Sequence, residues 1–355
     1  MKIKTLLLIT MTFLPICMKA QAPQIAVVRP DGTTFIRTTW DSAYAVAQNG
    51  DFIYLPGAQI NLGNSFSISK RLQIYGAGHF PDSTSATMQT LLTGSLTILG
   101  EASGGSIEGV KVDNVTTLGG PTKLRNYTIK RCYFKGLFFT SPLGQDSLPE
   151  NILITESIIT HFNASSGLTG GGADNNLFIK NIISTYVWSF QYCTFKNNIF
   201  LWPYYQQYEP NIFNYVSHSL VENNIFLNPV PAPLSAQNCY NIYLNNLKLT
   251  NSNYESSETC PASAQDNISV PASNNIFISY DGNYGIIYGN NFHLAPGCPG
   301  IGAGNDGTDV GIYGTNNPTP DGWLPSNPHI FFKQVDGETG SDGKLHIKVG
   351  VRTNN

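Results

Sequence analysis

The sequence predicts an all-β solenoid, namely a parallel β-helix. Three observations predict it: a short unit recurs along the chain, charged residues make up only 12 % of it, and Gly (34) and Pro (21) are abundant. Soluble domains carry about 25 % charged residues on average, so the solvated faces of surface helices are poorly represented here. We therefore expect short strands that are joined by many turns.

The recurring unit is an Asn pair followed by an alternating apolar strand. Asn pairs start at positions 175, 197, 223, 245, 274 and 290, and the first four intervals are 22, 26, 22 and 29 residues. A loose period of this size indicates a solenoid, and the alternation indicates strands rather than helices. The three clearest copies are Asn197-Asn198-Ile199-Phe200-Leu201, Asn223-Asn224-Ile225-Phe226-Leu227 and Asn274-Asn275-Ile276-Phe277-Ile278.

The unit has a physical explanation in a stack of coils. Successive coils lie about 4.8 Å apart, so Asn side chains at the same point of each coil can form a ladder of amide hydrogen bonds. Asn also tolerates the left-handed backbone of a sharp corner. We expect Ile199 to point into the coil, and an Ile199→Asp substitution to destabilise the fold severely.

The first 20 residues have the features of a secretory signal peptide. Lys2 and Lys4 precede an apolar run at 6–16, and cleavage after Ala20 fits the small residues that follow. The run is too short for a membrane span, and Ile16 replaces the small residue expected before a lipidated Cys17. The predicted location is therefore outside the cytoplasm: secreted, periplasmic or on the cell surface.

Charge and cysteine content limit the partners. The net charge is −3, without a basic patch for nucleic acid or a polybasic patch for membrane lipids. Five of the six Cys lie beyond the leader, so at least one has no partner within the chain. Cys239 and Cys260 flank a turn-rich segment and form the favoured disulfide, whereas Cys132 and Cys193 are expected to be buried small hydrophobes.

The start of the predicted domain combines a strand pair, a short helix and the first coils. We expect the strand pair at 27–36, around a turn at 30–32, and the helix at 39–47 with Thr or Asp as its cap. The first coil strands are expected in Gly50-Asp51-Phe52-Ile53-Tyr54-Leu55-Pro56-Gly57 and Ile68-Ser69-Lys70-Arg71-Leu72-Gln73-Ile74-Tyr75-Gly76-Ala77-Gly78.

These opening motifs resemble the right-handed parallel β-helix proteins of the pectate-lyase-like superfamily. The resemblance extends over about residues 33–316, and it implies that the helix caps the open end of the solenoid, where unpaired strand edges would otherwise invite aggregation. The resemblance indicates a fold more specifically than it indicates an activity.

The end of the chain is expected to close the solenoid. Residues 295–314 resemble the closing coil of secreted β-helix proteins of Bacteroidota-type bacteria. We therefore expect a β-helix domain at 21–316, then a Pro-rich connector and a hairpin at 317–355. The hairpin strands, at 329–335 and 344–351, are expected to fold over the last coil. Asp306 and Asp309 either hold calcium or form turns, and turn chemistry is favoured.

A catalytic cluster is expected from the resemblance to polysaccharide lyases, which use a cationic base and a means of neutralising a carboxylate. The best candidates are Lys130, Arg131 and Glu156, with Lys130 and Arg131 on opposite faces of one strand. The alternative is that they are solvated side chains of an outer sheet. The clustered acids of the hydrolases of this fold are not apparent in the sequence. We expect no metal and no cofactor, with calcium as the one exception to consider.

An aromatic segment is the best candidate for ligand binding. Exposed rings stack on sugar faces, and this segment follows directly after the clearest repeat. The predicted ligand-binding residues are Trp202, Tyr204, Tyr205 and Tyr208. In the preceding coil, Tyr186, Trp188, Phe190 and Tyr192 alternate, and we expect half of them in the core and half on the outer sheet.

Three functions are compatible with the sequence. The favoured one is a secreted or cell-surface protein that binds polysaccharide or surface glycan without catalysis. The alternatives are a lyase or glycoside hydrolase acting on uronate-containing glycans, and an adhesin or structural surface protein.

Overall fold

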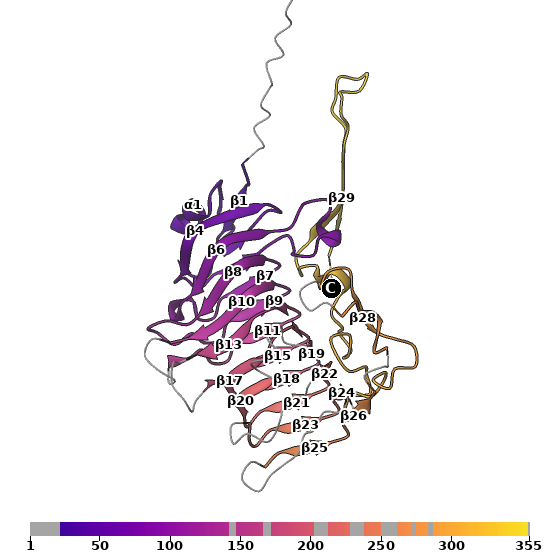
Figure 1. Cartoon of the computed structure of the whole chain (residues 1–355). Helices are drawn as coiled ribbons and strands as arrows, with labels where there is room; N and C mark the ends of the chain where they lie inside the picture. The colour runs from indigo at the N-terminus through magenta and orange to yellow at the C-terminus, as the bar shows by residue number, and fades with distance from the viewer. Residues whose placement is uncertain are drawn as a thin grey trace, which may run out of the picture.

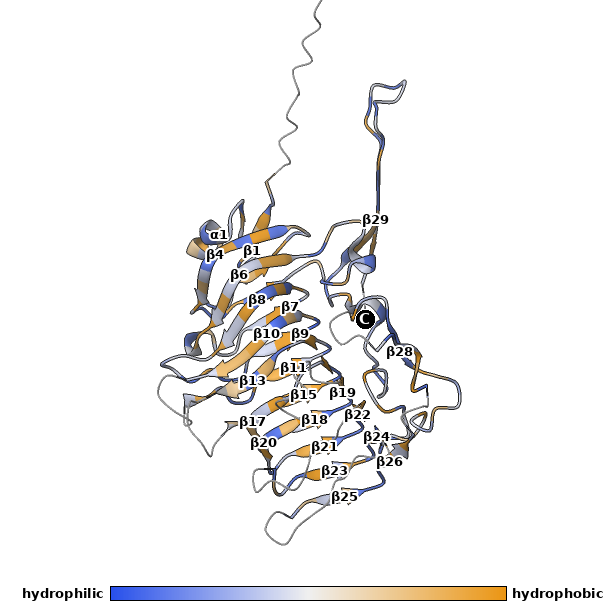
Figure 2. Cartoon of the chain, viewed as in Figure 1, coloured by the Kyte–Doolittle hydropathy of each residue, from blue (hydrophilic) through white to orange (hydrophobic). Residues whose placement is uncertain are grey.

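The chain folds as an all-β solenoid, a stack of parallel coils that carries one α-helix at its start (Figure 1). The computed structural model describes residues 22–141, 147–165, 172–201, 212–227, 238–249, 261–271, 275–282 and 287–353. Apolar residues concentrate in the strands of the stack (Figure 2). Within these ranges no helix has the length and hydrophobicity of a membrane span.

The longest sheet, here called sheet A, contains twelve strands. β1 pairs antiparallel with β2 and β3, and the ten strands from β3 to β25 pair in parallel. In spatial order they are β2 (Thr34–Arg37), β1 (Ile25–Val28), β3 (Phe52–Tyr54), β5 (Gln73–Tyr75), β7 (Ser106–Glu108), β9 (Thr128–Lys130), β11 (Leu153–Thr155), β15 (Leu177–Ile179), β18 (Thr194–Lys196), β21 (Leu220–Glu222), β23 (Ile242–Leu244) and β25 (Ser263–Gln265).

Sheet B follows sheet A around a sharp corner of each coil. Its strands are β26 (Ile268–Val270), β24 (Leu247–Leu249), β22 (Ile225–Phe226), β19 (Ile199–Phe200), β16 (Ile182–Ile183), β12 (Ile158–Ile159), β10 (Tyr133–Thr140), β8 (Lys111–Leu118), β6 (Leu91–Ile98) and β4 (Gln59–Ile68), with β13 (Phe162–Ser165) beside β10.

The smaller elements complete the coils and the chain ends. Sheet C is β14 (Ala173–Asp174), β17 (Val187–Gln191) and β20 (Phe213–Ser217). Two antiparallel pairs lie outside the stack: β27 (Phe277–Ser279) with β28 (Asn291–Leu294), and β29 (His329–Val335) with β30 (Ile347–Arg352). The helices are α1 (Trp40–Val46) and the short 3-10 turns η1 (Asp82–Thr84), η2 (Gly100–Ala102) and η4 (Asp321–Trp323).

The predicted cap of the stack is confirmed. Thr39 is the N-cap of α1, and its hydroxyl oxygen accepts a hydrogen bond from the Ser42 backbone N–H at 3.3 Å. Trp40 is buried against the first coils, where its ring meets Phe66 edge-to-face at 5.3 Å. The helix and the β1–β2 pair therefore cover the end of the stack.

Each residue of the recurring unit has a distinct position. Asn197 occupies the corner between sheets A and B with φ = 54°, where Asn tolerates the left-handed conformation. Asn198 is fully buried, and its side-chain amide donates to Asn224 Oδ1 at 3.0 Å. Ile199 then begins β19, and Phe200 points into the coil, where its ring stacks on Phe226 at 4.8 Å.

The buried amides form the expected ladder. Asn181 donates to Asn198 at 3.1 Å, Asn224 to Asn246 at 2.9 Å, and Asn246 to Asn267 at 2.9 Å. Each ladder oxygen also accepts the backbone N–H of the residue one coil earlier, as in Asn198 N to Asn224 Oδ1 at 2.8 Å. The ladder therefore satisfies the buried backbone donors at the corner, which would be costly to leave unpaired.

Two details of the repeat differ from the expectation. The pair Asn175-Asn176 precedes a sheet A strand, so it lies at a different corner from Asn197-Asn198 and is not one coil away from it. Ile199 is fully buried, but it belongs to an apolar cluster outside the coil rather than to the coil interior. The interior position is taken by Phe200, because the side chains of a strand alternate between its faces.

The parallel stack ends at β26, and the chain then turns back. Residues 298–326, here called the strap, run along the outside of the corner toward the first coils. Asn245 donates to the Ala303 carbonyl at 3.1 Å, Asn197 to the Gly311 carbonyl at 3.1 Å, and the Lys180 ammonium to the Asn317 carbonyl at 2.6 Å. The expectation that this segment forms a closing coil is therefore wrong.

The strap seals a second apolar cluster against the outer face of sheet B. Buried residues of the sheet, among them Ile199 and Ile225, pack with Val310 and Ile312 of the strap. At Gly311 (φ = 84°) a Cβ atom would lie 2.6 Å from Ile225 Cδ1, so only Gly permits this close approach.

The strap also determines where the hairpin lies. β29 and β30 occupy nearly the expected residues, but they project beside the first coils rather than over the last one (Figure 1). The strap has carried the chain back along the whole stack. The domain boundary predicted at 316/317 stays a prediction, and it falls within the strap.

The cysteines are distributed largely as expected. Cys132 and Cys193 are buried free thiols inside the coils, where burial raises the pKa of each to about 12. Cys298 is also free and buried at the start of the strap. Cys239 is disulfide-bonded, and Cys260, its expected partner, lies outside the described residues.

Candidate functional site

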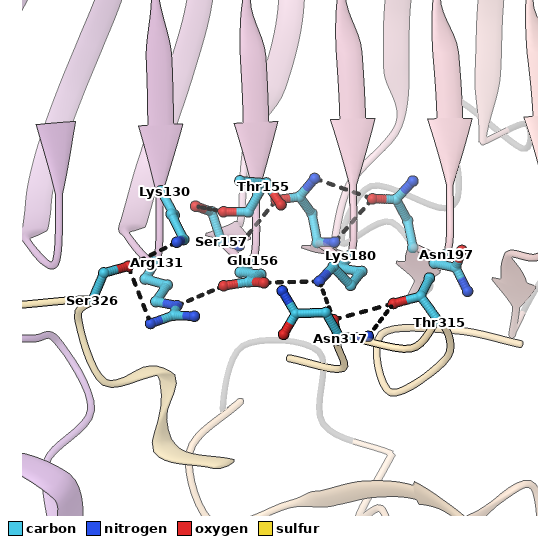
Figure 3. A network of polar contacts seen from close by, with 12 residues as sticks. Lys130, Arg131, Thr155, Glu156, Ser157, Lys180, Asn197, Thr315, Asn317 and Ser326 are labelled. Carbon is cyan, nitrogen blue, oxygen red and sulfur yellow. Dashed lines mark hydrogen bonds and ion pairs between the residues drawn. The ribbon is translucent and has the colours of Figure 1, made fainter. Parts of the chain in front are cut away.

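The predicted catalytic residues come together at the corner between sheets A and B, beneath the strap (Figure 3). Lys130 ends β9, and Arg131 follows in the left-handed conformation with φ = 49°. Glu156 and Lys180 occupy the same corner in the next two coils, with φ = 50° and 57°. The left-handed turn directs each of these side chains outward, toward the strap.

The corner charges form a continuous row, here called the ion row: Arg131, Glu156 and Lys180. Arg131 Nε lies 2.5 Å from Glu156 Oε2, and Lys180 Nζ lies 2.8 Å from Glu156 Oε1. The three side chains are only 7, 4 and 8 % exposed. The row is therefore an ion-paired group that is almost completely shielded from water.

The strap satisfies the remaining donors of this region. Arg131 Nη1 donates to the Leu324 carbonyl at 2.7 Å, and Lys130 Nζ donates to Ser326 Oγ at 2.7 Å. The Ser326 backbone N–H in turn donates to Glu108 Oε1 at 2.6 Å. Arg131 Nη1 also reaches Ser326 Oγ, at 3.5 Å, so the expectation that Lys130 and Arg131 lie on opposite faces is wrong.

The electrostatics favour an ionised carboxylate at Glu156. Burial opposes its ionisation, but the hydrogen bond from Lys180 and the charges of Arg131 and Lys180 outweigh burial and hold the pKa of Glu156 below its ordinary value of 4.5. An ionised Glu156 between two cations is a stable arrangement, because each buried charge then has a partner.

The geometry argues for a structural role of this group. A general base must reach the proton that it abstracts, within about 3.2 Å or through one water. Arg131 and Glu156 are instead buried and engaged with one another and with the strap. The assignment of Lys130, Arg131 and Glu156 as catalytic stays a prediction, and nothing in the arrangement presents a free base to a substrate.

Sequence reasoning missed Lys180 and the strap. A signal for Lys180 was present, because the pairs Arg131-Cys132, Glu156-Ser157 and Lys180-Asn181 occupy the place of Asn197-Asn198 in earlier coils. No comparable signal existed for the strap, because its contacts join residues as far apart as Lys130 and Ser326, 196 positions along the chain.

The predicted ligand-binding residues Trp202, Tyr204, Tyr205 and Tyr208 lie outside the described residues. The neighbouring coils nevertheless present aromatic side chains on the outer face of sheet C. Trp188 and Tyr215 are half-buried with ring centroids 5.0 Å apart, and Tyr186 packs edge-to-face against Trp188 at 6.0 Å. Phe190 is fully buried in the core, whereas Tyr186 and Trp188 are half-buried and Tyr192 is exposed. One of the four residues, rather than the expected half, therefore lies in the core.

A column of rings continues this surface at the corner between sheets C and A. Tyr192, His218 and Tyr240 are exposed and left-handed, with φ of 52°, 53° and 61°. Their rings stack at 4.8 and 4.7 Å, close to the spacing of the coils. We call these three rings, together with Tyr186, Trp188 and Tyr215, the aromatic surface.

The two parts of the aromatic surface, the column of stacked rings and the rings on sheet C, differ in what they offer a ligand. Within the column the rings stack on one another, so the ring faces between neighbours are covered. On sheet C the rings are tilted by 38°, and part of each remains accessible. Gln191 and Ser217, in register on β17 and β20, place polar side chains beside them.

The described part of the chain contains no group of three His, Cys, Asp or Glu side chains arranged to hold a metal ion. Asp306 Oδ1 accepts hydrogen bonds from the Thr308 backbone N–H at 3.0 Å and its hydroxyl at 2.7 Å, and Asp309 accepts from the Gly302 N–H at 2.9 Å. Both carboxylates therefore form turns within the strap.

Comparisons with known proteins add no assignment: no protein-family model and no curated protein matches the chain.

Proposed function

We propose that this is a secreted or cell-surface parallel β-helix protein that binds carbohydrate on its aromatic surface without catalysing a reaction. The observation that carries the proposal is the accessible ring group on sheet C, where Trp188 and Tyr215 lie 5.0 Å apart. Aromatic side chains combine apolar area with a polar tip, which suits the apolar faces and hydroxyls of sugars.

The position of the aromatic surface supports binding to a long glycan. Its rings come from successive coils that repeat at about 4.8 Å, so several sugar units could be contacted along one edge of the stack. In the sequence, the segment with Trp202 and Tyr204 falls between β19 and β20, the strand that carries Tyr215. The proposal includes this segment as a further contact.

The non-catalytic part of the proposal is supported by the ion row. Its charges are paired with each other and covered by the strap, which is the arrangement of a structural group. Membership of the pectate-lyase-like superfamily, an origin in Bacteroidota-type bacteria and export by the signal peptide are parts of the same proposal, supported by the sequence motifs.

Affinity electrophoresis with soluble neutral and acidic polysaccharides tests the binding. We expect retardation in at least one gel, and Trp188→Ala to weaken it by about tenfold, in line with about 1.5 kcal/mol for a lost ring contact. Phe331→Ala, an exposed ring on the hairpin, is the matched control. Equal retardation of the parent and the Trp188→Ala variant would contradict the assignment of carbohydrate binding to this surface.

A turnover assay separates binding from the enzymatic alternatives. The mature chain is incubated with the same polysaccharides, with and without calcium, and both reducing ends and ultraviolet absorbance are followed. We expect neither signal. Absorbance gain would establish a lyase and direct attention to Lys130, Arg131 and Glu156, whereas reducing ends alone would establish a hydrolase. Absence of both binding and turnover favours an adhesin or structural protein.

A further inference from the structure

A groove lies between the first coils and the foot of the C-terminal hairpin. Its volume is about 470 Å³, within the range of small-molecule sites, about 300–1,000 Å³. One wall is formed by Tyr54 and Tyr75 of β3 and β5, and the other by Ile330, Lys333 and Val349 of β29 and β30. The strap creates this groove by returning the chain to the first coils.

The groove is mainly apolar. Tyr54 and Tyr75 stack with centroids 5.5 Å apart and an interplanar angle of 18°, and Tyr54 is 39 % exposed. Pro325 and Pro328 also line the groove. Such a lining recognises a flat or aliphatic body, because burial of apolar area gives about 25 cal/mol per Å².

The polar groups of the groove are positive or neutral. The Lys333 ammonium has no carboxylate within ion-pair distance in the described part of the chain. Arg352 Nε donates to His329 Nε2 at 3.0 Å. Burial raises the pKa of Tyr75, and the nearby negative charge of Glu108 raises it further. Glu108 does not line the groove, and its carboxylate accepts a hydrogen bond from the Ser326 N–H.

We infer that this groove binds a small amphipathic carboxylate, with its apolar body against the Tyr54–Tyr75 pair and its carboxylate at Lys333. Charge complementarity selects the anion, since the lining supplies a cation without a counter-ion. The inference is independent of the aromatic surface, which belongs to later coils, and does not rest on carbohydrate binding.

A matched set of three probes tests the charge preference: 3-phenylpropionate, 3-phenylpropanol and 3-phenylpropylamine. These share one apolar body and differ in charge. Binding to the mature chain is measured by calorimetry and by ligand-observed NMR. We expect the acid to bind, the alcohol to bind about fivefold more weakly, as for a partly exposed ion pair, and the amine more weakly still. Equal affinities for all three, or no binding of the acid, would overturn the inference.

Two Lys variants locate the carboxylate. Lys333→Met keeps the apolar stem and removes the charge. It should lower the affinity for the acid by about fivefold and leave the affinity for the alcohol unchanged. Lys348→Met is the control, because Lys348 lies over the Phe332 ring and does not line the groove. An equal loss in both variants would show general attraction to the hairpin and would also overturn the inference.

Tyr54→Ala tests the apolar wall. The substitution should lower the affinity for both the acid and the alcohol by about tenfold, because it removes a stacked ring from the wall. An unchanged affinity for both probes would place their binding elsewhere on the protein.

Discussion

At the scale of single residues, the corner position has two roles that depend on side-chain chemistry. Where the corner residue is Asn, its amide holds the strap, by one hydrogen bond each at Asn197 and Asn245 and by two at Asn223. Where it is charged, as in the ion row, it pairs with its neighbours in adjacent coils, and the two cations, Arg131 and Lys180, also donate to strap carbonyls. The backbone requirement is the same, a left-handed turn, and Arg, Glu and Lys accept that strain because the surrounding contacts fix it.

The ion row predicts a large stability loss for Glu156→Gln. The variant leaves Arg131 and Lys180 buried without a counter-charge, and removal of one partner of a buried pair costs about 3 kcal/mol or more. Urea unfolding at pH 7 measures the loss. Glu101→Gln, an exposed carboxylate hydrogen-bonded to Thr122, is the control and should change the free energy of unfolding by less than about 0.5 kcal/mol.

The same residue predicts a pH dependence. In the folded protein the pKa of Glu156 lies below its ordinary value of 4.5. The stabilising contribution of the ionised carboxylate is therefore complete at a pH above the pKa that Glu156 has in the unfolded chain, and it is lost as the pH falls through the pKa of the folded state. The difference in unfolding free energy between the parent and Glu156→Gln should therefore shrink below about pH 4.5. A difference that stays constant down to pH 2 would contradict this assignment.

The amide ladder predicts a loss for Asn224→Ala. The substitution removes the acceptor for the Asn198 backbone N–H at 2.8 Å and the donor to the Phe195 carbonyl at 2.8 Å. Buried groups left unpaired cost about 1–3 kcal/mol each, so we expect a loss of about 3 kcal/mol in urea unfolding. Asn64→Ala, at an exposed position of β4 where the strand register shifts, should be neutral. Similar effects of both variants would argue against the ladder as a stabilising element.

At the scale of elements, the two-residue strands of sheet B, β12, β16, β19 and β22, are buried on both faces. Their inward residues fill the coil, as Phe200 does, and their outward residues lie beneath the strap, as Ile199 and Ile225 do. Strands buried on both faces are continuous apolar runs rather than alternating ones. This explains why the recurring unit is Ile-Phe rather than Ile followed by a polar residue.

The outer cluster changes the reason for the Ile199→Asp prediction but not its direction. The carboxylate would be buried between sheet B and the strap at a fully buried position, at a cost of several kcal/mol. Ile242→Asp, outward on sheet A and 44 % exposed, is the matched control. Thermal unfolding should show a large drop only for Ile199→Asp, and equal melting temperatures would contradict the placement of the strap.

At the scale of the whole molecule, the strap makes a solenoid depend on contacts that are distant in sequence. A simple solenoid is stabilised by neighbouring repeats alone and can fray from its ends. Here Arg131 is joined to Leu324, 193 positions later, and Asn197 to Gly311, 114 positions later. Early and middle coils are therefore linked to one C-terminal segment, which should make unfolding more cooperative.

Two truncations separate the strap from the hairpin. Ending the chain at residue 328 removes the hairpin, keeps the strap, and should change the free energy of unfolding by less than about 1 kcal/mol, since most hairpin side chains are exposed. Ending it at residue 297 exposes the outer cluster and should give a broader unfolding transition or aggregation with binding of a hydrophobic dye. Equal behaviour of the two truncations would rule out this role for the strap.

The sequence by itself determined the parallel coils, the capping helix and the hairpin strands. These features rest on local rules: alternation within a strand, the N-cap at Thr39, and the tolerance of Asn for a left-handed corner. It also placed Lys130, Arg131 and Glu156 in one region, because equivalent corners of adjacent coils must lie about one strand spacing apart.

Only the tertiary structure decided what that region is. The strap, residues 298–326, runs back along the corner and buries Arg131 and Glu156. It also packs against Ile199 and positions the hairpin beside the first coils. These contacts join residues far apart in sequence, so no local pattern encodes them, and they depend on the combined fit of many side chains. The same path forms the groove between Tyr54 and Lys333.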